Sequence, residues 1–401
     1  MNLRSTDSIS VEAQQSKASS LKNTEVGRVP TDWEVVCLRE VANFGGGTTP
    51  PRKNFEKFYA SGTHPWVKTL DLNNGYISST EENVTEAAFS ETSLKMHPIG
   101  TVLVAMYGGF NQIGRTGLIQ VSAAINQALV AVITKKERLV PTYLLNYLNY
   151  KVDYWKTVAS SSRKDPNITS NDVKNFILPL PSVIEQSAIA NALSDVDALI
   201  QELEKLIAKK QAIKTATMQQ LLTGRTRLPQ FAHHSDGRKK GYKPSELGEI
   251  PEDWEVEPIG SLLSITTGCR NTQDKIEEGL YPFFVRSQTI EKINSFSFDG
   301  EAVLTAGDGV GTGKIFHYIN GKFDFHQRVY LMYNFGERVD GYFFYIFFSN
   351  YFYDRIMSMT AKSSVDSVRR EMIADMRMLL PVKQEQIAIA TILSEMDQEI
   401  Q

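Results

Sequence analysis

The chain contains the block EVGRVPTDWEV at residues 25–35 and a close copy, ELGEIPEDWEV, at residues 246–256. A second block, PSVIEQSAIANALSDVDALIQ at residues 181–201, returns as PVKQEQIAIATILSEMDQEIQ at residues 381–401. Both blocks recur after roughly 200 residues, a period that is too long for a solenoid repeat and fits a whole domain. The sequence therefore predicts a tandem duplication, in which a globular unit followed by a helix occurs twice.

A long helix is predicted at the first copy of the second block. Ser182 and Glu185 fit a capping box, and apolar residues then recur every three or four positions up to Leu222. Gly224 suits the end of this helix. About 40 residues at 1.5 Å each give a helix roughly 60 Å long, and so narrow an apolar stripe requires a partner helix. The second copy begins near Val382 and carries the same stripe over fewer residues.

The rest of the chain divides around these two blocks. The globular parts show short apolar runs between clusters of Gly, Asn and Thr, which indicate short strands with a few helices. In the first part we expect strands at 102–106, 128–133 and 176–180 and a helix at 141–155. The predicted segments are a tail at 1–24, a globular unit at 25–180, a spacer helix at 181–224, a polar and basic linker at 225–245, a second globular unit at 246–380 and a short helix at 381–401.

The composition is ordinary, with 42% hydrophobic residues, 22% charged residues and a formal net charge of −3. Because no global positive field directs the chain to nucleic acid, any DNA contact must come from locally placed basic residues. The two cysteines are too few for a disulfide framework or a zinc site. We find no secretory leader and no apolar run that could span a bilayer, which predicts a cytoplasmic protein with no membrane partner.

Motifs for catalysis are missing from the sequence. The stretch GDGVGTGK at residues 307–314 departs from the spacing of a P-loop and of a dinucleotide-binding loop. The six histidines do not have the spacing of metal ligands, and no nucleophile elbow occurs. The Asn/Asp-Pro-Pro-aromatic motif of an amino-methyltransferase and the paired Pro-Asp and Glu-x-Lys motifs of a nuclease are also missing. We therefore predict a binding protein with no catalytic residue and no metal ligand.

Taken in order, the motifs resemble those of the specificity subunit of type I restriction–modification systems. The resemblance covers nearly the whole chain and is carried first by the doubled G-x-[IV]-P-x-D-W-E at residues 27–34 and 248–255. The doubled helix start, [IL]-P-x-x-x-E-Q-x-x-I-A, is the second such feature. Further typical stretches are GRTGLIQ and AAINQALVAVI within residues 114–133, PNITSNDVKNFILPLP at 166–181 and MQQLLTGRTRL at 218–228.

This resemblance implies an α+β fold with two similar mixed α/β target recognition domains, separated by long antiparallel coiled-coil helices in a pseudo-twofold internal repeat. Each domain would read one half of a bipartite double-stranded DNA site, and the helices would set the spacing and dock two methyltransferase subunits. S-adenosylmethionine on those subunits, and ATP with Mg²⁺ on the restriction and translocase subunits, would be the cofactors. The chain itself would hold no cofactor and catalyse nothing.

Three alternatives stay open at this point. The chain could be a coiled-coil structural adaptor that reads no DNA. It could be the recognition subunit of a fused modification–restriction enzyme. The stripe of the short second helix could also support self-association through the C-terminal helix.

Base reading needs Arg, Lys, Asn, Gln, Ser and Thr side chains at the edges of the DNA grooves, and phosphate contacts need Lys, Arg, Ser, Thr and backbone amides. Candidate DNA-contacting residues therefore come from polar turns and loops, although each such segment also fits an ordinary surface turn. In the first unit they are Thr48, Thr49, Arg52, Lys53, Lys68, Tyr107, Asn111, Arg115, Asn126, Gln127, Arg163, Lys164 and Asn167. In the second unit they are Arg270, Asn271, Arg286, Gln288, Lys314, His326, Gln327, Arg328, Lys362, Ser363, Ser364 and Arg369.

A partner-binding surface is predicted at the two helix starts, because the same side chains recur there. The isoleucines also fit plain packing between helices, and the first glutamate also fits a capping box. The six predicted partner-binding residues are Glu185, Gln186, Ile189, Glu385, Gln386 and Ile389.

Overall fold

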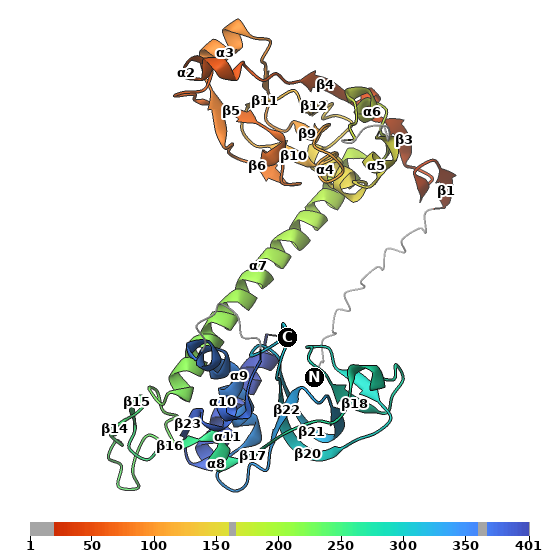
Figure 1. Ribbon diagram of the computed structural model, residues 1–401. Coiled ribbons are helices and arrows are strands. Elements are labelled where there is room, and N and C mark those ends of the chain that lie inside the picture. The colour runs from red at the N-terminus through yellow and green to blue at the C-terminus, as the bar shows by residue number, and fades with distance from the viewer. Residues whose placement is uncertain (1–19, 160–165, 360–366, 401) are drawn as a thin grey trace, which may run out of the picture. The chain divides into compact units, whose positions relative to one another are not determined.

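The computed structural model describes residues 20–159, 166–359 and 367–400 and divides the chain into two compact units. Unit 1 is Met1–Gln201 and unit 2 is Glu202–Gln401. Along the chain, the 40-residue helix α7 (Val183–Leu222) lies between two sheet-rich regions of mixed α/β type (Figure 1). The first half of α7 belongs to unit 1 and the second half to unit 2, so each unit includes about half of this helix.

Unit 1 is built on two main sheets, with strand orders β4–β12–β9–β10–β6 and β7–β5–β11–β8. All four residues of the central strand β9 are buried, as expected for a strand covered on both faces. Two smaller sheets pair β1 with β2 and β13 with β3. The strands are β1 (Leu21–Thr24), β2 (Gly27–Pro30), β3 (Glu34–Cys37), β4 (Ala42–Gly46), β5 (His64–Val67), β6 (Tyr76–Ile77), β7 (Glu82–Val84), β8 (Met96–His97), β9 (Val102–Ala105), β10 (Thr116–Ile119), β11 (Ala123–Ile125), β12 (Leu129–Thr134) and β13 (Ile177–Leu180).

One face of the larger sheet is covered by α4, which starts with Pro141 in its first turn, where the missing N–H costs no hydrogen bond (Figure 1). Leu144 and Leu148 of this helix are fully buried in the same core as Val104. The helices of unit 1 before α7 are α1 (Leu38–Val41), η1 (Arg52–Asn54), α2 (Phe55–Phe58), η2 (Thr69–Asp71), α3 (Glu86–Glu91), α4 (Pro141–Tyr150), α5 (Tyr154–Val158) and α6 (Ser170–Lys174).

Unit 2 repeats this plan with one six-stranded sheet of order β17–β22–β20–β21–β18–β19. β18 pairs with β21 in parallel, and the other neighbours in the sheet are antiparallel. Two-stranded sheets again pair β14 with β15 and β16 with β23. The strands are β14 (Tyr242–Ser245), β15 (Gly248–Pro251), β16 (Glu255–Pro258), β17 (Ser264–Thr267), β18 (Tyr281–Phe284), β19 (Glu291–Ile293), β20 (Phe298–Ala306), β21 (Phe316–Phe325), β22 (Val329–Tyr333) and β23 (Arg377–Leu380).

The core of unit 2 is dominated by the aromatic side chains of α9, including Phe344, Phe348 and Phe352. This helix is capped by Asp340, whose carboxylate accepts a hydrogen bond from Phe343 N at 2.8 Å. The helices of unit 2 after α7 are α8 (Ile259–Leu262), η3 (Thr272–Asp274), α9 (Gly341–Ser358), α10 (Arg370–Ala374) and α11 (Lys383–Gln398).

The elements expected from the sequence are largely confirmed. The three strands expected in the first unit are β9, β12 and β13, and α7 ends at Leu222, followed by Gly224 with a φ of 68°. Ser182 Oγ accepts a hydrogen bond from Glu185 N at 3.2 Å, as a helix cap should. The single helix expected at 141–155 is wrong, because the chain breaks it into α4 and α5 and so packs Trp155 against Gly114, where a Cβ would lie 2.0 Å from the indole ring.

Two segments that the sequence places outside the globular units take part in strands. Residues 21–24, expected in the tail, form β1 and pair with β2, whereas residues 1–19 lie outside the described residues. Residues 225–245, expected as a linker, include β14 and fold onto unit 2. There, Tyr242 Oη donates a hydrogen bond to Gly224 O at 3.0 Å. Two of the basic side chains in this segment, Arg227 and Lys240, form ion pairs with Asp253 of unit 2.

A buried glutamine joins the helix start to the core of unit 1. Gln186 Oε1 accepts a hydrogen bond from Val140 N at 2.9 Å, at the start of α4. Its Nε2 donates to the carbonyl oxygens of Arg138 and Pro181, both at 2.8 Å. The side chain is fully buried, so the amide satisfies three backbone groups that water cannot easily reach.

Gln386 repeats all three hydrogen bonds in unit 2. Its Oε1 accepts from Asp340 N at 2.9 Å, and its Nε2 donates to the carbonyl oxygens of Arg338 and Pro381 at 2.8 Å. Each partner lies 200 positions after its counterpart in unit 1. The duplication read from the sequence is thus present in the hydrogen bonds as well as in the order of the elements.

Candidate nucleic-acid interface

In unit 1, two of the segments predicted to contact DNA meet at one edge of the sheets. The turn after β4 lies beside the turn between β11 and β12, and the Thr49 hydroxyl donates a hydrogen bond to the side-chain oxygen of Gln127. Asn126 Oδ1 accepts from Ala128 N at 3.2 Å and so caps its own turn. Gly47 allows the close approach, because a Cβ there would lie 2.1 Å from Asn126 O.

Unit 2 has the same arrangement with different side chains. Gln327 Nε2 donates a hydrogen bond to Asn271 Oδ1 at 2.7 Å. A Cβ on Gly268 would lie 2.0 Å from Phe325 O, so this turn also requires a glycine. The glutamine contacts a threonine in unit 1, whereas the corresponding glutamine contacts an asparagine in unit 2, so the two units present related but different polar edges.

A glycine-rich loop borders this edge in unit 1. The loop connects β9 to β10 and contains three glycines with φ between 73° and 119°. Ile168 N donates a hydrogen bond to Met106 O at 3.0 Å, which places the chain just after residues 160–165 beside the loop. The predicted residues on this loop are the exposed Tyr107 and Asn111 and the half-buried Arg115.

The corresponding loop of unit 2 connects β20 to β21. Val368 N donates a hydrogen bond to Gly307 O at 2.7 Å, so the chain just after residues 360–366 again lies beside the glycine-rich loop. Lys314 is exposed, and its Nζ lies 5.4 Å from the centre of the Tyr353 ring. In both units, therefore, four chain segments form one polar surface. They are the turn after β4 or β17, the turn before β12 or β22, the glycine-rich loop and the chain just after residues 160–165 or 360–366.

Two basic side chains of this surface in unit 2 share one carboxylate. Arg286 Nη1 lies 2.9 Å from Asp308 Oδ1, and Arg328 Nε lies 3.7 Å from Asp308 Oδ2. Exposed ion pairs of this kind contribute only about 0–1 kcal/mol, so Asp308 holds neither guanidinium group strongly. Arg270 differs, because it is held at 3.0 Å by the fully buried Asp324 and therefore has a structural role in the unit.

In unit 1, two of the predicted cations already have acidic partners. Lys68 Nζ lies 2.7 Å from Glu81 and 3.2 Å from Glu82, and Arg52 lies 2.6 Å from Glu82 and 4.2 Å from the Tyr59 ring centre. Burial alone would lower the pKa of Lys68, but its hydrogen bonds to the two glutamates raise that pKa, so the ammonium group stays charged. Of the predicted cations that the structure describes in this unit, Lys53 and Arg115 are the two that form no ion pair with a described residue.

The other predicted DNA-contacting residues are distributed as follows. Thr48 and Asn167 are half-buried, His326 is buried, and Gln288 and Arg369 are exposed. Five of the predicted residues lie outside the described residues, namely Arg163, Lys164, Lys362, Ser363 and Ser364.

The chain should lose stability as the pH falls below about 6.5. Burial lowers the pKa of His97, His317 and His326, so the folded state resists protons that the unfolded chain accepts. This stability is fully present above the unfolded pKa and is lost as the pH falls toward the lower folded pKa, at about 1.4 kcal/mol per unit of pKa difference. Thermal unfolding at a series of pH values should show the Tm falling, and His317→Asn should flatten the profile. The exposed His233 provides the control, since His233→Asn should leave the slope unchanged.

The predicted partner-binding residues lie mostly inside the units. Gln186, Gln386, Glu385 and Ile389 are buried, whereas Glu185 and Ile189 are half-buried. The two glutamines therefore recur for a structural reason, and Glu185 and Ile189 are the two of the six predicted residues that are not buried. Their binding of a partner stays a prediction.

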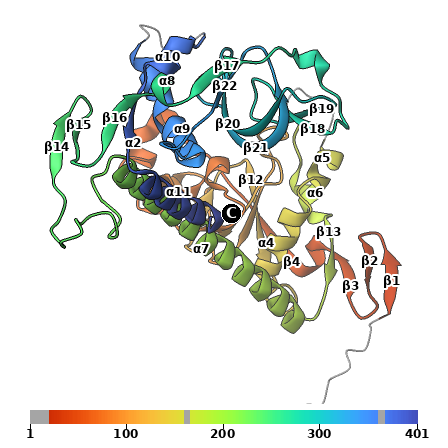
Figure 2. The ribbon, with the colours of Figure 1, turned by 90° about the horizontal axis from the view of Figure 1, so that it is seen from below.

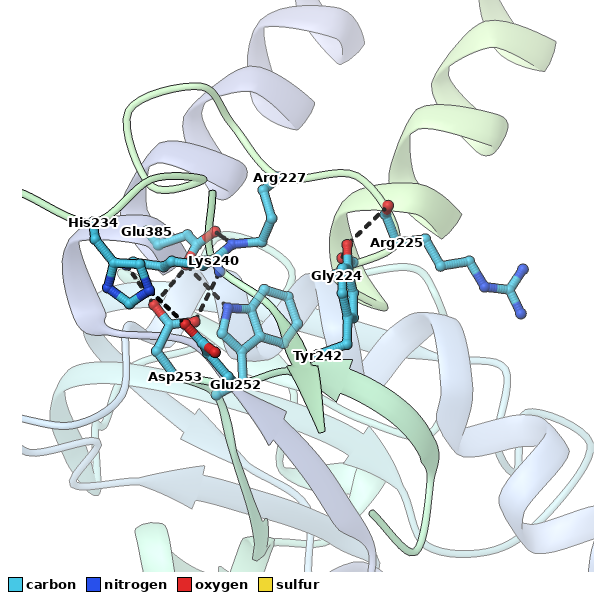
Figure 3. Close-up of polar contacts among 10 residues, drawn as sticks. Gly224, Arg225, Arg227, His234, Lys240, Tyr242, Glu252, Asp253 and Glu385 are labelled. Carbon is cyan, nitrogen blue, oxygen red and sulfur yellow. Dashed lines mark hydrogen bonds and ion pairs between the residues drawn. The ribbon is translucent and has the colours of Figure 1, made fainter. Parts of the chain in front are cut away.

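Arg227 is the centre of an ion-pair cluster that no sequence pattern predicts (Figure 3). Arg227 Nε lies 2.6 Å from Glu385 Oε1, and its Nη1 lies 2.8 Å from Asp253 Oδ1. Lys240 Nζ binds the other oxygen of Asp253 at 2.7 Å, and Trp254 Nε1 donates to Glu385 Oε2 at 3.0 Å. Burial alone would raise the pKa of Asp253, but the hydrogen bonds from both cations hold that pKa below its usual range.

The described residues show no arrangement for metal binding or membrane insertion. Within residues 20–159, 166–359 and 367–400, no three His, Cys, Asp or Glu side chains gather into a metal-binding group. None of the helices in the same ranges combines the length and apolarity needed to cross a bilayer.

The doubled fold, with one polar loop surface on each unit, defines a class of two-part binding proteins. The family model of the type I restriction modification DNA specificity domain matches residues 30–215 and 251–401. The chain therefore belongs to this family.

Curated relatives agree with this assignment. The specificity subunit of the type I restriction enzyme MjaIX from Methanocaldococcus jannaschii is 30% identical over 298 residues, which cover 71% of this chain and 65% of that protein. The MjaVIII specificity subunit of the same organism is 26% identical over 408 residues, which cover 96% of this chain and 91% of that protein. The chain spans less than two thirds of the MjaIX subunit and 56% of the putative MjaX subunit.

Solved structures show the same fold at low sequence identity. The S subunit of a type I restriction–modification system from M. genitalium has a TM-score of 0.57 and 15% identity, and the match covers 92% of this chain and 90% of that one. The HsdS subunit from Thermoanaerobacter tengcongensis has a TM-score of 0.54 and 16% identity, with 94% and 92% covered.

Proposed function

We propose that this chain is the non-catalytic DNA-recognition subunit of a type I restriction–modification complex, and that each unit reads one half of a bipartite double-stranded DNA site. The observation that carries the proposal is the polar edge found in both units, with Thr49 against Gln127 in one and Asn271 against Gln327 in the other. Two related surfaces with different side chains suit two half-sites of different sequence, because base edges are read by such side chains.

On this proposal, residues 25–180 and 246–380 are the target recognition domains, and residues 181–224 and 381–401 are spacer helices in a pseudo-twofold repeat. Antiparallel pairing of the helices is supported inside unit 2, where Lys210 Nζ lies 2.7 Å from Glu399 and Lys214 forms an ion pair with Asp397 (Figure 2). The later of the two lysines in α7 thus contacts the earlier of the two acids, so α7 and α11 run in opposite directions. A stiff helical spacer would fix the number of unread base pairs between the half-sites.

The proposed partners are two methyltransferase subunits and the restriction or translocase subunits of the complex. S-adenosylmethionine, ATP and Mg²⁺ would then be bound by those subunits and not by this chain, which would act in the cytoplasm. Support comes from family membership and from the names of the relatives, which are specificity subunits of type I restriction enzymes.

We expect Gln127→Ala to relax sequence preference in one half-site and Gln327→Ala to relax it in the other. Loss of a good base contact removes about 1–3 kcal/mol of discrimination, which is roughly a 5- to 150-fold change in preference. The measurement is selection of bound sequences from random DNA by the chain together with a methyltransferase subunit.

Gln120→Ala is the matched control, because Gln120 is also exposed but lies at the opposite end of β10 from the glycine-rich loop. It should leave both half-sites unchanged. If either test variant altered both half-sites equally, the assignment of one half-site to each unit would be refuted.

A further inference from the structure

Two arginines of unit 2 reach Asp308 from different segments of the chain. Arg286 follows β18, Arg328 lies in the turn between β21 and β22, and Asp308 lies in the glycine-rich loop. Arg286 Nη1 donates a hydrogen bond to Asp308 Oδ1 at 2.9 Å, and Arg328 Nε lies 3.7 Å from Asp308 Oδ2. The arginine side chains are 43% and 66% exposed, so the two guanidinium groups form one compact pair that is open to solvent.

Backbone hydrogen bonds hold these three segments together. Gly307 N donates to Arg328 O at 2.8 Å, which joins the glycine-rich loop to the turn between β21 and β22. His326 N donates to Phe284 O at 2.9 Å, which joins the same turn to the end of β18, two residues before Arg286. Both arginines therefore start from the polar edge on which the candidate base-reading residues lie.

The aspartate argues against a phosphate group as the ligand of this pair. Two positive groups and one negative group give a net charge of +1. His326 adds no charge, because its Nδ1 accepts a hydrogen bond from Arg328 N at 2.9 Å and burial lowers the pKa of its ring. A phosphate bound by both arginines would lie close to Asp308 and would be repelled by it. The edge of a base pair carries no net charge and is not repelled in this way.

A guanidinium group matches the edge of guanine in particular. Guanine presents the acceptors O6 and N7 side by side in the major groove, and the planar fork of an arginine can bind both at once. Arg286 directs only Nη1 to Asp308, and Arg328 directs only Nε to it, so other N–H donors of each group remain available. Neighbouring bases are about 3.4 Å apart along a strand, which suits two arginines that meet at one carboxylate.

Unit 1 has different side chains at the matching positions. Met106 N donates to Ala128 O at 2.8 Å, just as the residue before Asp308 donates to Arg328 O. This match places Ala128 at the position of Arg328 and Tyr107 at the position of Asp308. Neither side chain is charged at neutral pH, so the duplication provides a unit without this group for comparison.

We propose that Arg286 and Arg328 each bind one guanine, so that the half-site read by unit 2 contains guanines in two neighbouring base pairs. Asp308 keeps phosphate groups away from the two arginines. This inference rests on the proposed function, which assigns one half-site to each unit, and it adds the identity of two of the bases.

The first test is selection of bound sequences from random DNA by the full chain together with a methyltransferase subunit. We expect one half-site to contain guanines in two neighbouring base pairs. Arg328→Ala should lower the preference for guanine in one of these pairs by roughly 5- to 150-fold, and Arg286→Ala should do so in the other. Arg238→Ala is the matched control, because Arg238 is also an exposed arginine paired with an aspartate, but it lies in the segment between α7 and β14. It should change neither position.

Base analogues in the selected sequence test the contact atom by atom. 7-Deazaguanine lacks the N7 acceptor, and at either position it should weaken binding by about fivefold or more. Hypoxanthine retains both O6 and N7, so it should bind as well as guanine. At the position that Arg328→Ala has relaxed, 7-deazaguanine should cause that variant little further loss. The same analogue in DNA outside the site is the control and should have no effect.

The outcomes separate this inference from the proposed function. A bipartite sequence without the two guanines, or arginine variants that weaken binding to all sequences equally, would overturn the inference alone and assign the arginines to phosphates. If no sequence were selected at all, the proposed function would fail as well. Arg328→Lys keeps the charge but loses the planar fork, so it should retain overall affinity and lose much of the guanine preference. Full preference in this variant would show that charge is sufficient and would also overturn the inference.

Discussion

Arg227→Ala should lower the free energy of unfolding of unit 2 by about 3–5 kcal/mol, because it leaves a buried carboxylate without its cation. Glu385 is 1% exposed and would keep only the hydrogen bond from Trp254 Nε1 at 3.0 Å. Asp253 would retain Lys240, so most of the loss arises at Glu385. Hydrogen exchange along α11, measured in the full chain by mass spectrometry, should be much faster in the variant, while exchange in β9 and β12 of unit 1 stays the same.

Three further variants separate the buried charge from other effects of the substitution. Arg238→Ala is the control, because this arginine is mostly exposed, and it should leave exchange along α11 unchanged. Arg227→Lys should give an intermediate loss, since one ammonium group cannot bind two carboxylates in the forked geometry of a guanidinium. Arg227→Met combined with Glu385→Leu should recover much of the stability, because no unpaired charge is then left inside. If Arg227→Ala and Arg238→Ala behaved alike, the cluster would have no stabilising role.

The elements and their order were predictable because local signals mark them. Ser182 and Gly224 lie at the two ends of α7, and both act through hydrogen bonds or backbone angles within a few residues of their own position. The buried strand β9 was equally clear, as an apolar run between glycines. The break between α4 and α5 was not predictable, because it depends on Trp155 packing against Gly114, about 40 residues earlier in the chain.

The role of repeated polar residues was harder to predict from the sequence. The recurrence of Gln186 and Gln386 at the two helix starts predicts a partner surface, whereas both side chains are buried. Their burial depends on backbone groups some 46–48 residues away, which come together only in the folded unit. Arg227 lies in a stretch that reads as a basic linker, and only the three-dimensional structure brings it to Asp253 and Glu385.

The candidate nucleic-acid interface could be predicted in part, less well than the helices and strands but better than the contacts of the buried polar residues. The sequence selected Thr49 and Gln127 separately as polar turn residues, but it could not show that they form a hydrogen bond. It could not separate Lys68, which is enclosed by two glutamates, from Arg328, which is 66% exposed beside one aspartate. A sequence shows which side chains are basic. Whether the charge of a basic side chain is neutralised depends on which acidic side chains lie close to it, and only the folded structure shows that.

Gln386→Ala should lower the free energy of unfolding of unit 2 by about 2–4 kcal/mol, because it leaves three backbone groups without partners. These are Asp340 N and the carbonyl oxygens of Arg338 and Pro381, and the variant also loses the link between α11 and the start of α9. Gln186→Ala should have the same effect on unit 1 alone. Hydrogen exchange in the full chain distinguishes the two, since the first variant should speed exchange in α9 and the second in α4.

The exposed Gln384 is the control, on the same helix and with the same side chain, and Gln384→Ala should change neither unit. A buried amide that binds three backbone groups should resist replacement even by a side chain of similar length, so Gln386→Met should remain destabilising. Because each glutamine contacts only its own unit, the two effects should also add in the double variant. A single variant that loosened both units equally would contradict the view that duplication produced two cores, each closed by its own glutamine.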